Sequence, residues 1–209
     1  MHAITDDQTV YDGLLASFKK TLVEASRDDA NEEIMTDCEK EVVDFDAFTK
    51  NRSLGWNGSP LSCDALYLCN KTGAWFLIEF KNGTLENAKE TDFRPRNNEF
   101  YGVVRKIFES LLLFTEKLRR TIEFTRNNLV FILVYNEEKN KNLKNCGLQK
   151  WREGITKWGH KNDILQMCHL SEILPQSFNV AYFDKLYVKR AYICSKALFE
   201  SEFVKKYMN

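Results

Sequence analysis

Two apolar segments separated by a short polar turn form the clearest pattern in the chain. Apolar side chains fill nearly every position of CDALYLC (63–69) and AWFLIEF (74–80). The intervening NKTG (70–73) supplies turn residues and a glycine suited to positive φ. The pattern predicts a β-hairpin. Because apolar residues point to both faces of both strands, the hairpin should lie centrally in a sheet that is covered on two sides.

A helix and a further strand are predicted after the hairpin. Residues 99–119 repeat apolar side chains at helical spacing over one wide face, and Asn97 or Asn98 can cap the start of this helix. LVFILVY (129–135) is typical of a buried strand. The order strand, helix, strand favours a right-handed crossover that brings the two strands together in parallel.

The N-terminal part of the chain is less regular. Residues 6–26 are predicted to form a helix because they carry an i, i+4 apolar stripe, made of Val10, Leu14, Phe18 and Leu22. Residues 27–41 are acidic and are predicted to be loop or frayed helix. VVDFDAF (42–48) fits either a short strand or the start of a helix, and SLGWNGSP (53–60) is a turn-rich connector.

The C-terminal part divides into a polar and an apolar region. The polar composition of residues 136–163 predicts an exposed segment with Trp151 and Trp158 in a helix. For these two tryptophans, core or partner contacts are favoured over base stacking. Residues 164–208 predict a short strand or loop near ILQMC and a terminal helix through KALFESEFVKKY.

These elements together predict one α/β domain over residues 1–209, with a central mixed β-sheet flanked by helices. Residues 42–135 would form its core. Residues 136–209 would form a helical or mixed extension packed on that core.

Composition and charge narrow the class of protein. The chain has 209 residues, and 30 Lys and Arg are balanced by 30 Asp and Glu. Zero formal net charge argues against a broadly basic nucleic-acid coat but leaves room for a local basic groove. The longest apolar run, 129–135, is too short to span a bilayer, and the N-terminus lacks the pattern of a signal peptide. We therefore expect a cytoplasmic protein without a membrane partner.

Cysteine and histidine spacing argues against structural zinc. The six cysteines include no C-x-x-C pair, and the three histidines have no ligand spacing. Reduced and mostly buried thiols are expected in such a chain.

Three charged residues interrupt the apolar hairpin. Asp64 lies on its first strand, and Glu79 and Lys81 lie two apart on its second, so their side chains leave the same face. Charges in a buried strand are costly unless they are paired or bind an ion. Two carboxylates with water and substrate oxygens suit one or two Mg²⁺ or Mn²⁺ ions. A neighbouring lysine can orient water or stabilise charge on a phosphate.

This arrangement resembles the PD-(D/E)XK nuclease superfamily, which has a restriction-endonuclease-like fold. Asp64 in SCDAL matches that family's first acid, and Glu79 and Lys81 in IEFKNG match its acid-x-Lys. The resemblance covers residues 60–135, with 6–26 as a candidate first helix. It implies that Asp64 and Glu79 ligate the metal, that all three residues act in catalysis, and that the substrate is DNA or RNA. The acid that this family often adds from its first helix is not assigned here.

Two other interpretations of the three charges stay open. They can form a structural salt-bridge group, or the fold can carry a decayed site that now serves a non-catalytic interaction protein. The E-x-K triplet is not informative by itself, because Glu137-Glu138-Lys139 repeats it in a stretch that predicts a solvated turn. A basic groove leading to Asp64 would favour the nuclease, and an acidic or apolar groove would favour the interaction protein.

Weaker candidates for nucleic-acid binding follow the hairpin. Arg94 and Arg96 lie in the loop after its second strand, and Arg105 and Lys106 lie on the next helix. They can contact phosphates, but a solvated loop and a charged helix face are equally good explanations. In the second case Lys106 would pair with Glu109. A homodimer or another protein partner is also left open.

Overall fold

A six-stranded mixed sheet organises the chain in the computed structural model, which describes residues 6–29, 31–50, 60–83, 99–141, 183 and 186–208. The strand order is β1-β2-β3-β4-β5-β6; the strands up to β4 pair antiparallel, and β4, β5 and β6 pair in parallel. Their bounds are Lys19–Thr21, Glu41–Asp44, Ala65–Cys69, Ala74–Lys81, Leu129–Tyr135 and Arg190–Ser195. The predicted α/β class, a mixed sheet flanked by helices, is confirmed.

The central hairpin forms as predicted. Ala65 pairs with Ile78 and Cys69 with Ala74, and Gly73 takes a positive φ of 66° at the turn. Every residue of β3 and all but the last of β4 are buried, so both faces are covered. The predicted parallel pairing of β4 with β5 is confirmed as well.

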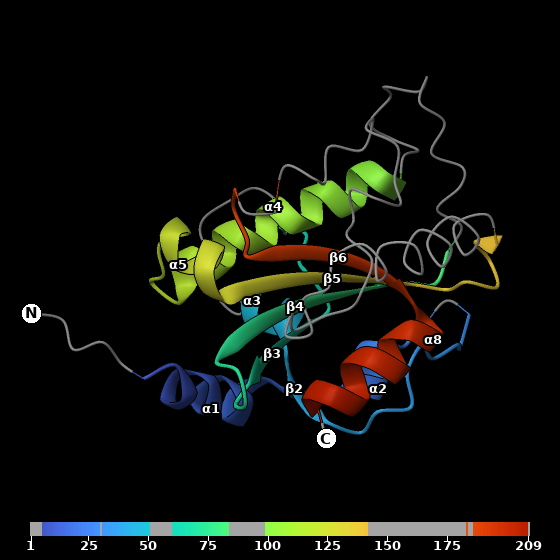
Figure 1. Cartoon of the computed structure of the whole chain (residues 1–209), viewed down its shortest axis with the longest axis horizontal. Helices are drawn as coiled ribbons and strands as arrows, with labels where there is room; N and C mark the ends of the chain where they lie inside the picture. The colour runs from blue at the N-terminus through green and yellow to red at the C-terminus, as the bar shows by residue number, and fades with distance from the viewer. Residues whose placement is uncertain are drawn as a thin grey trace, which may run out of the picture.

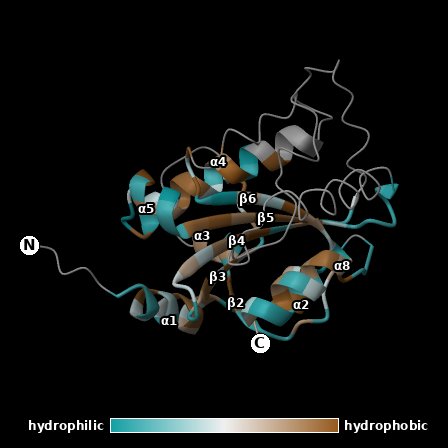
Figure 2. Ribbon diagram, in the orientation of Figure 1, coloured by the Kyte–Doolittle hydropathy of each residue, from teal (hydrophilic) through white to brown (hydrophobic). Residues whose placement is uncertain are grey.

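Helices cover the sheet on opposite sides (Figure 1). α4, Glu99–Lys117, lies on one side, where the ring of Phe114 meets Trp75 of β4. α8, Lys196–Leu198, and the π-helix η3, Phe199–Met208, lie on the other, where Phe203 meets Phe76. Figure 2 shows the hydrophobic colouring concentrated on the middle strands between these helices.

The predicted helix over residues 6–26 is wrong in its extent. It is divided into α1, Asp7–Phe18, and α2, Leu22–Ala25, with the edge strand β1 between them. The Thr21 side chain accepts from Glu24 N, and the Glu24 side chain accepts from Thr21 N at 2.8 Å. This reciprocal capping box starts a new helix, and T-x-x-E was its sequence signal. Glu24 therefore caps α2.

Other elements resolve or correct the remaining predictions. Segment 42–48, for which either a short strand or the start of a helix was predicted, contains both. The strand β2 ends at Asp44, and α3, Phe45–Lys50, begins directly after it. α5, Ile122–Asn128, and β6 were not predicted. β6 continues the sheet beside β5, and η3 covers it, so this part of the predicted extension belongs to the sheet itself. The segments 53–59, 84–98 and 142–182, with Trp151, Trp158 and ILQMC, lie outside the described residues.

The second E-x-K triplet forms the predicted turn, with Glu138 exposed, but Glu137 is not solvated. Glu137 is buried, and its carboxylate accepts from the backbone N of Lys196 at 3.0 Å and of Ala197 at 3.2 Å. These are free N–H groups at the start of α8, which favour a negative charge. Glu137 thus joins the end of β5 to the C-terminal helix.

No helix among the described residues is long and apolar enough to cross a membrane.

We predict that Glu137→Ala lowers the free energy of unfolding by about 2 kcal/mol, since two buried N–H groups lose a charged acceptor. Urea denaturation measures the change. The neighbouring exposed residue gives a matched control, and Glu138→Ala should stay within about 0.5 kcal/mol of wild type. Equal stability of the two variants would contradict the capping role.

Candidate functional site

Asp64 lies where the β3–β4 ladder ends. The Asp64 backbone N donates at 3.0 Å to the carbonyl of Ile78, the residue that pairs with Ala65, so this bond departs from the ladder register by one residue. The side chain of Asp64 also contacts β4, because the backbone N of Phe80 donates to Asp64 Oδ2 at 2.7 Å. Asp64 directly precedes Ala65, and Glu79 directly follows Ile78, so the two acids flank the last pair of the ladder. One carboxylate oxygen of Asp64 is therefore fixed by the backbone, and the other is directed at the site.

Glu79 carries the most buried charge of the site. Its side chain is 0% exposed in the middle of the sheet, whereas that of Asp64 is 27% exposed. Lys81, which is two residues along the same strand, brings its ammonium to 3.3 Å from Glu79 Oε1. The structure thus brings together the three residues that the sequence singled out, Asp64, Glu79 and Lys81.

Lys106 belongs to the site, although its sequence context predicted a weak phosphate contact or a solvated helix face. Its ammonium lies 2.8 Å from Glu79 Oε1, 3.0 Å from Glu79 Oε2 and 3.6 Å from Asp64 Oδ1. It is therefore neither on a solvated helix face nor paired with Glu109. Instead, Arg105 pairs with Glu109, and Arg94 and Arg96 lie outside the described residues.

Helix α4 aims Lys106 at the sheet because Lys106 borders the buried face of the helix. Val103, Ile107 and Ser110 on that face are buried. Ser110 Oγ also accepts from the backbone N of Cys63 at 2.8 Å, which fixes α4 beside Asp64. Lys106 is one helical turn before Ser110, so its position at the edge of the apolar stripe was the available signal.

The electrostatics of the site follow from burial and like charge. The pKa of Glu79 is raised from its usual 4.5 to about 7: burial contributes most, the charge of Asp64 adds to it, and Lys106 and Lys81 oppose the rise. Burial also raises the pKa of Asp64, opposed by Lys106 and the Phe80 N–H. Burial lowers the pKa of Lys106, but the charges of Glu79 and Asp64 outweigh it, and the net shift is upward. The two acids are thus hard to ionise together without a cation.

The site offers two carboxylates to a small divalent ion. Lys106 Nζ lies 2.8 Å from Glu79 Oε1 and 3.6 Å from Asp64 Oδ1, so these oxygens are separated by no more than the sum, 6.4 Å. One ion with ligand bonds of about 2.1 Å requires its two ligand oxygens within about 4.2 Å of each other, a separation that this bound permits. Carboxylate oxygens are the ligands that Mg²⁺ and Mn²⁺ prefer. Within the described residues, no group of three or more His, Cys, Asp or Glu is placed to hold a metal, so water or substrate would complete the shell.

A cavity of about 640 Å³ opens beside Asp64 and Lys81. The residues after α2 and the residues after β4 form much of its lining. Its charged lining residues are Arg27, Asp28, Asp29, Asp64 and Lys81. Acidic side chains outnumber basic ones, and Arg27 pairs with Asp29 at 3.6 Å. This cavity is therefore not the basic groove that would favour a nuclease by itself.

Amide side chains at the end of β4 and β5 hold the acidic loop that follows α2. Asn82 Nδ2 donates to Asp28 Oδ2 at 2.9 Å and to Glu33 Oε2 at 2.6 Å. Asn136, after β5, donates to Asn82 Oδ1 at 2.7 Å. Asn82 and Asn136 follow neighbouring parallel strands, and crevices at such carboxyl ends are common ligand sites. Asn82 and Asn136 were not among the residues predicted for the site.

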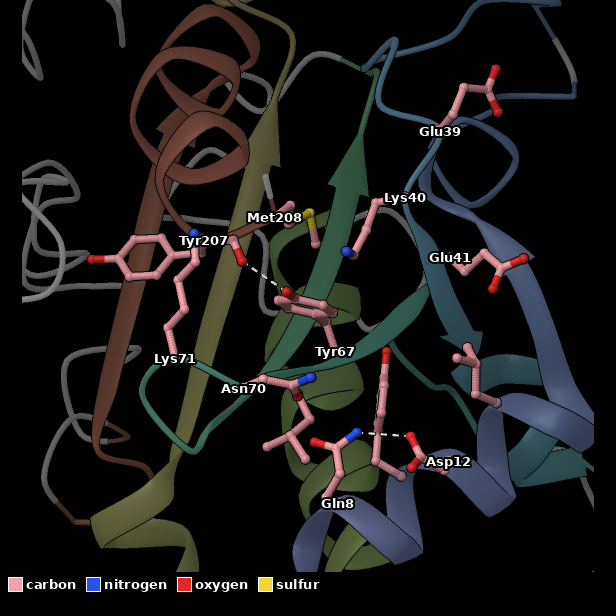
Figure 3. A pocket seen from close by; sticks show the side chains of 13 residues that line it. Gln8, Asp12, Glu39, Lys40, Glu41, Tyr67, Asn70, Lys71, Tyr207 and Met208 are labelled. Atoms are coloured by element: carbon pink, nitrogen blue, oxygen red, sulfur yellow. Dashed lines mark hydrogen bonds between the residues drawn. The ribbon is translucent and has the colours of Figure 1, made fainter.

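A second cavity, of about 530 Å³, lies at the other end of β3 (Figure 3). Tyr67 Oη donates to the Tyr207 carbonyl at 2.7 Å across it, and Gln8 donates to Asp12 at 2.7 Å on its α1 side. The first of these contacts joins β3 to η3, and the second lies within α1. Among the described residues predicted for the site, Asp64, Glu79, Lys81, Arg105 and Lys106, none lines this cavity.

No protein-family model, curated protein or solved structure matches the chain. The resemblance to the PD-(D/E)XK superfamily therefore stays a prediction that depends on the residues and their geometry.

We predict that Lys106→Met destabilises the fold by about 3 kcal/mol at pH 8, because it leaves the Glu79 carboxylate buried beside Asp64. The loss should shrink as the pH falls towards 7 and stay level below it. Without the Lys106 ammonium the pKa of Glu79 rises above its wild-type value of about 7, so the folded variant takes up a proton, and gains stability, at a higher pH than wild type does. Denaturant titrations at pH 8 and pH 5 measure both effects.

Two variants serve as controls for this prediction. Arg105→Met breaks an ion pair with a half-exposed arginine on the same helix and should cost less than about 1 kcal/mol at either pH. Adding Glu79→Leu to Lys106→Met should restore most of the lost stability, since a buried pair can be replaced by apolar residues. A loss for Lys106→Met that does not change between pH 8 and pH 5 would contradict this account.

Proposed function

We propose that the protein is a metal-dependent phosphodiester hydrolase that acts on nucleic acid. The observation that supports the proposal most is the convergence of Asp64 and Glu79, from adjacent strands, on a single cation position. A second ammonium, that of Lys81, lies beside it at 3.3 Å from Glu79. This is the donor set of a Mg²⁺ or Mn²⁺ centre next to a group that can meet phosphate charge.

Each residue would have a distinct role in such a reaction. Asp64 and Glu79 would hold the ion, with Asp64 oriented through its hydrogen bond from Phe80 N. A bound divalent ion would supply an activated water and neutralise charge on the phosphate. Lys81, with 27% of its side chain exposed and lining the adjoining cavity, would position the water or stabilise the developing charge.

The substrate class is inferred from the charge chemistry and from the resemblance. A phosphodiester is the anion that an ion and an ammonium, side by side, are suited to polarise. Arg94 and Arg96 belong to the segment that begins directly after the cavity residue Gly83, and we propose that they contact the phosphate backbone.

A non-catalytic interaction protein on the same scaffold is the second candidate. Two observations favour it: Lys106 already neutralises the two carboxylates, and the cavity beside Asp64 has more acidic than basic side chains. In that case the charges would act as a structural group, and the cavity would receive a protein partner.

We predict that wild-type protein binds Mn²⁺ at one site in calorimetric titrations and cleaves DNA or RNA when Mg²⁺ or Mn²⁺ is added. Asp64→Asn and Glu79→Gln should lose both properties, because each removes a carboxylate ligand. Lys81→Met should keep the metal site and lower kcat by about 10²-fold, the usual effect of losing one group that stabilises transition-state charge.

Glu41→Gln is the matched control for charge, since it removes one half-exposed carboxylate from β2, which neighbours the edge strand β1. It should leave binding and cleavage unchanged. Failure of wild type to cleave supercoiled, single-stranded and duplex DNA and RNA at saturating metal would contradict the hydrolase. It would favour the interaction protein instead.

A further inference from the structure

We propose that Lys106 is the resident cation of this site, and that a divalent ion enters by displacing it. This inference rests on the proposed metal centre at Asp64 and Glu79 and identifies the residue that controls its occupancy. The Lys106 ammonium contacts both oxygens of Glu79, at 2.8 and 3.0 Å, and faces Asp64 Oδ1 at 3.6 Å.

The lysine and the ion would require the same atoms. Oδ2 of Asp64 accepts from Phe80 N, so Oδ1 is the oxygen that is free of backbone bonding and directed at the site. Glu79 has no solvent-exposed surface through which an ion could approach from another side. An ion bound to these carboxylates would lie against the ammonium, and two cations at such a distance repel each other strongly. Occupation by one therefore excludes the other.

Lys106 is placed so that it can leave. Its side chain is 21% exposed and reaches the carboxylates from α4, so its long stem can carry the ammonium outward while the helix stays packed. Glu79 does not lose all compensation on departure, because Lys81 stays at 3.3 Å. The displaced ammonium stays attached to the same helix, within reach of a phosphate bound at the site.

Exchange explains why Lys106 lies between two carboxylates that are also suited to ligate a metal ion. Two ionised acids at this separation need a positive charge between them, and Lys106 supplies it. A divalent ion replaces it because it brings twice the charge and can also bind water and substrate oxygens. Lys106 thus acts as a positioning residue that preserves the ligand geometry and lowers the apparent metal affinity.

The test is a comparison of Mn²⁺ affinity by calorimetry in wild type, Lys106→Gln and Lys19→Gln. Lys106→Gln removes the competing ammonium and leaves two acids that repel each other, so it should bind Mn²⁺ at least about tenfold more tightly than wild type, a difference of about 1.4 kcal/mol. Lys19→Gln removes the same charge from the edge strand β1, where Lys19 pairs with Glu41, and should match wild type.

The outcomes separate the two proposals. Equal affinities of wild type and Lys106→Gln would overturn the exchange and leave the metal centre in place. A tighter Lys106→Gln matched by an equally tighter Lys19→Gln would reduce the effect to net charge and would also overturn it. Absence of Mn²⁺ binding in all three proteins would overturn the metal centre and the exchange together.

A second measurement uses wild type alone and does not depend on the folding of a variant. Acetic anhydride labelling followed by mass spectrometry reports the accessibility of each lysine amine. With Mn²⁺ at saturation, labelling of Lys106 should rise several-fold, whereas Lys19 should not change. Bound Mn²⁺ with unchanged labelling of Lys106 would overturn the exchange.

Discussion

The buried carboxylate of Glu79 is the constraint on which the rest of this structure depends. β4 has strands on both sides and helices on both faces, so a charge in its side chain has no access to water. Such a charge persists only beside a cation. Lys106 supplies that cation from α4, and Ser110 of the same helix holds Cys63 next to Asp64. The need to neutralise Glu79 thus also fixes how α4 lies on the sheet.

The position of the site follows from the change of strand direction at β4. This strand pairs antiparallel with β3 and parallel with β5. The start of β3 therefore lies beside the carboxyl ends of β4 and β5. Asp64 comes from the first of these and Glu79 and Lys81 from the second. Apolar packing of α4 on one face and of η3 on the other holds these strand ends in place, as a site with fixed ligands requires.

The sequence predicted what depends on local pattern. The hairpin, β5 and the long helix α4 follow from apolar runs and helical periodicity, and the hairpin brings Asp64 and Glu79 to the same end of its two strands. Lys106 could not be placed in this way, because its role depends on how a helix distant in sequence docks on the strand. β1 and β6 were missed because short strands at the sheet margins gain their stability from their neighbours more than from their own pattern.

The most direct measurement is anomalous diffraction at the manganese edge from crystals grown with Mn²⁺. The account predicts a peak about 2.1 Å from carboxylate oxygens of both Asp64 and Glu79. It also predicts that the Lys106 ammonium has moved away from Glu79. A site without an anomalous peak at saturating Mn²⁺, with Lys106 still paired to Glu79, would contradict the central claim and make the three charges a structural ion-pair group.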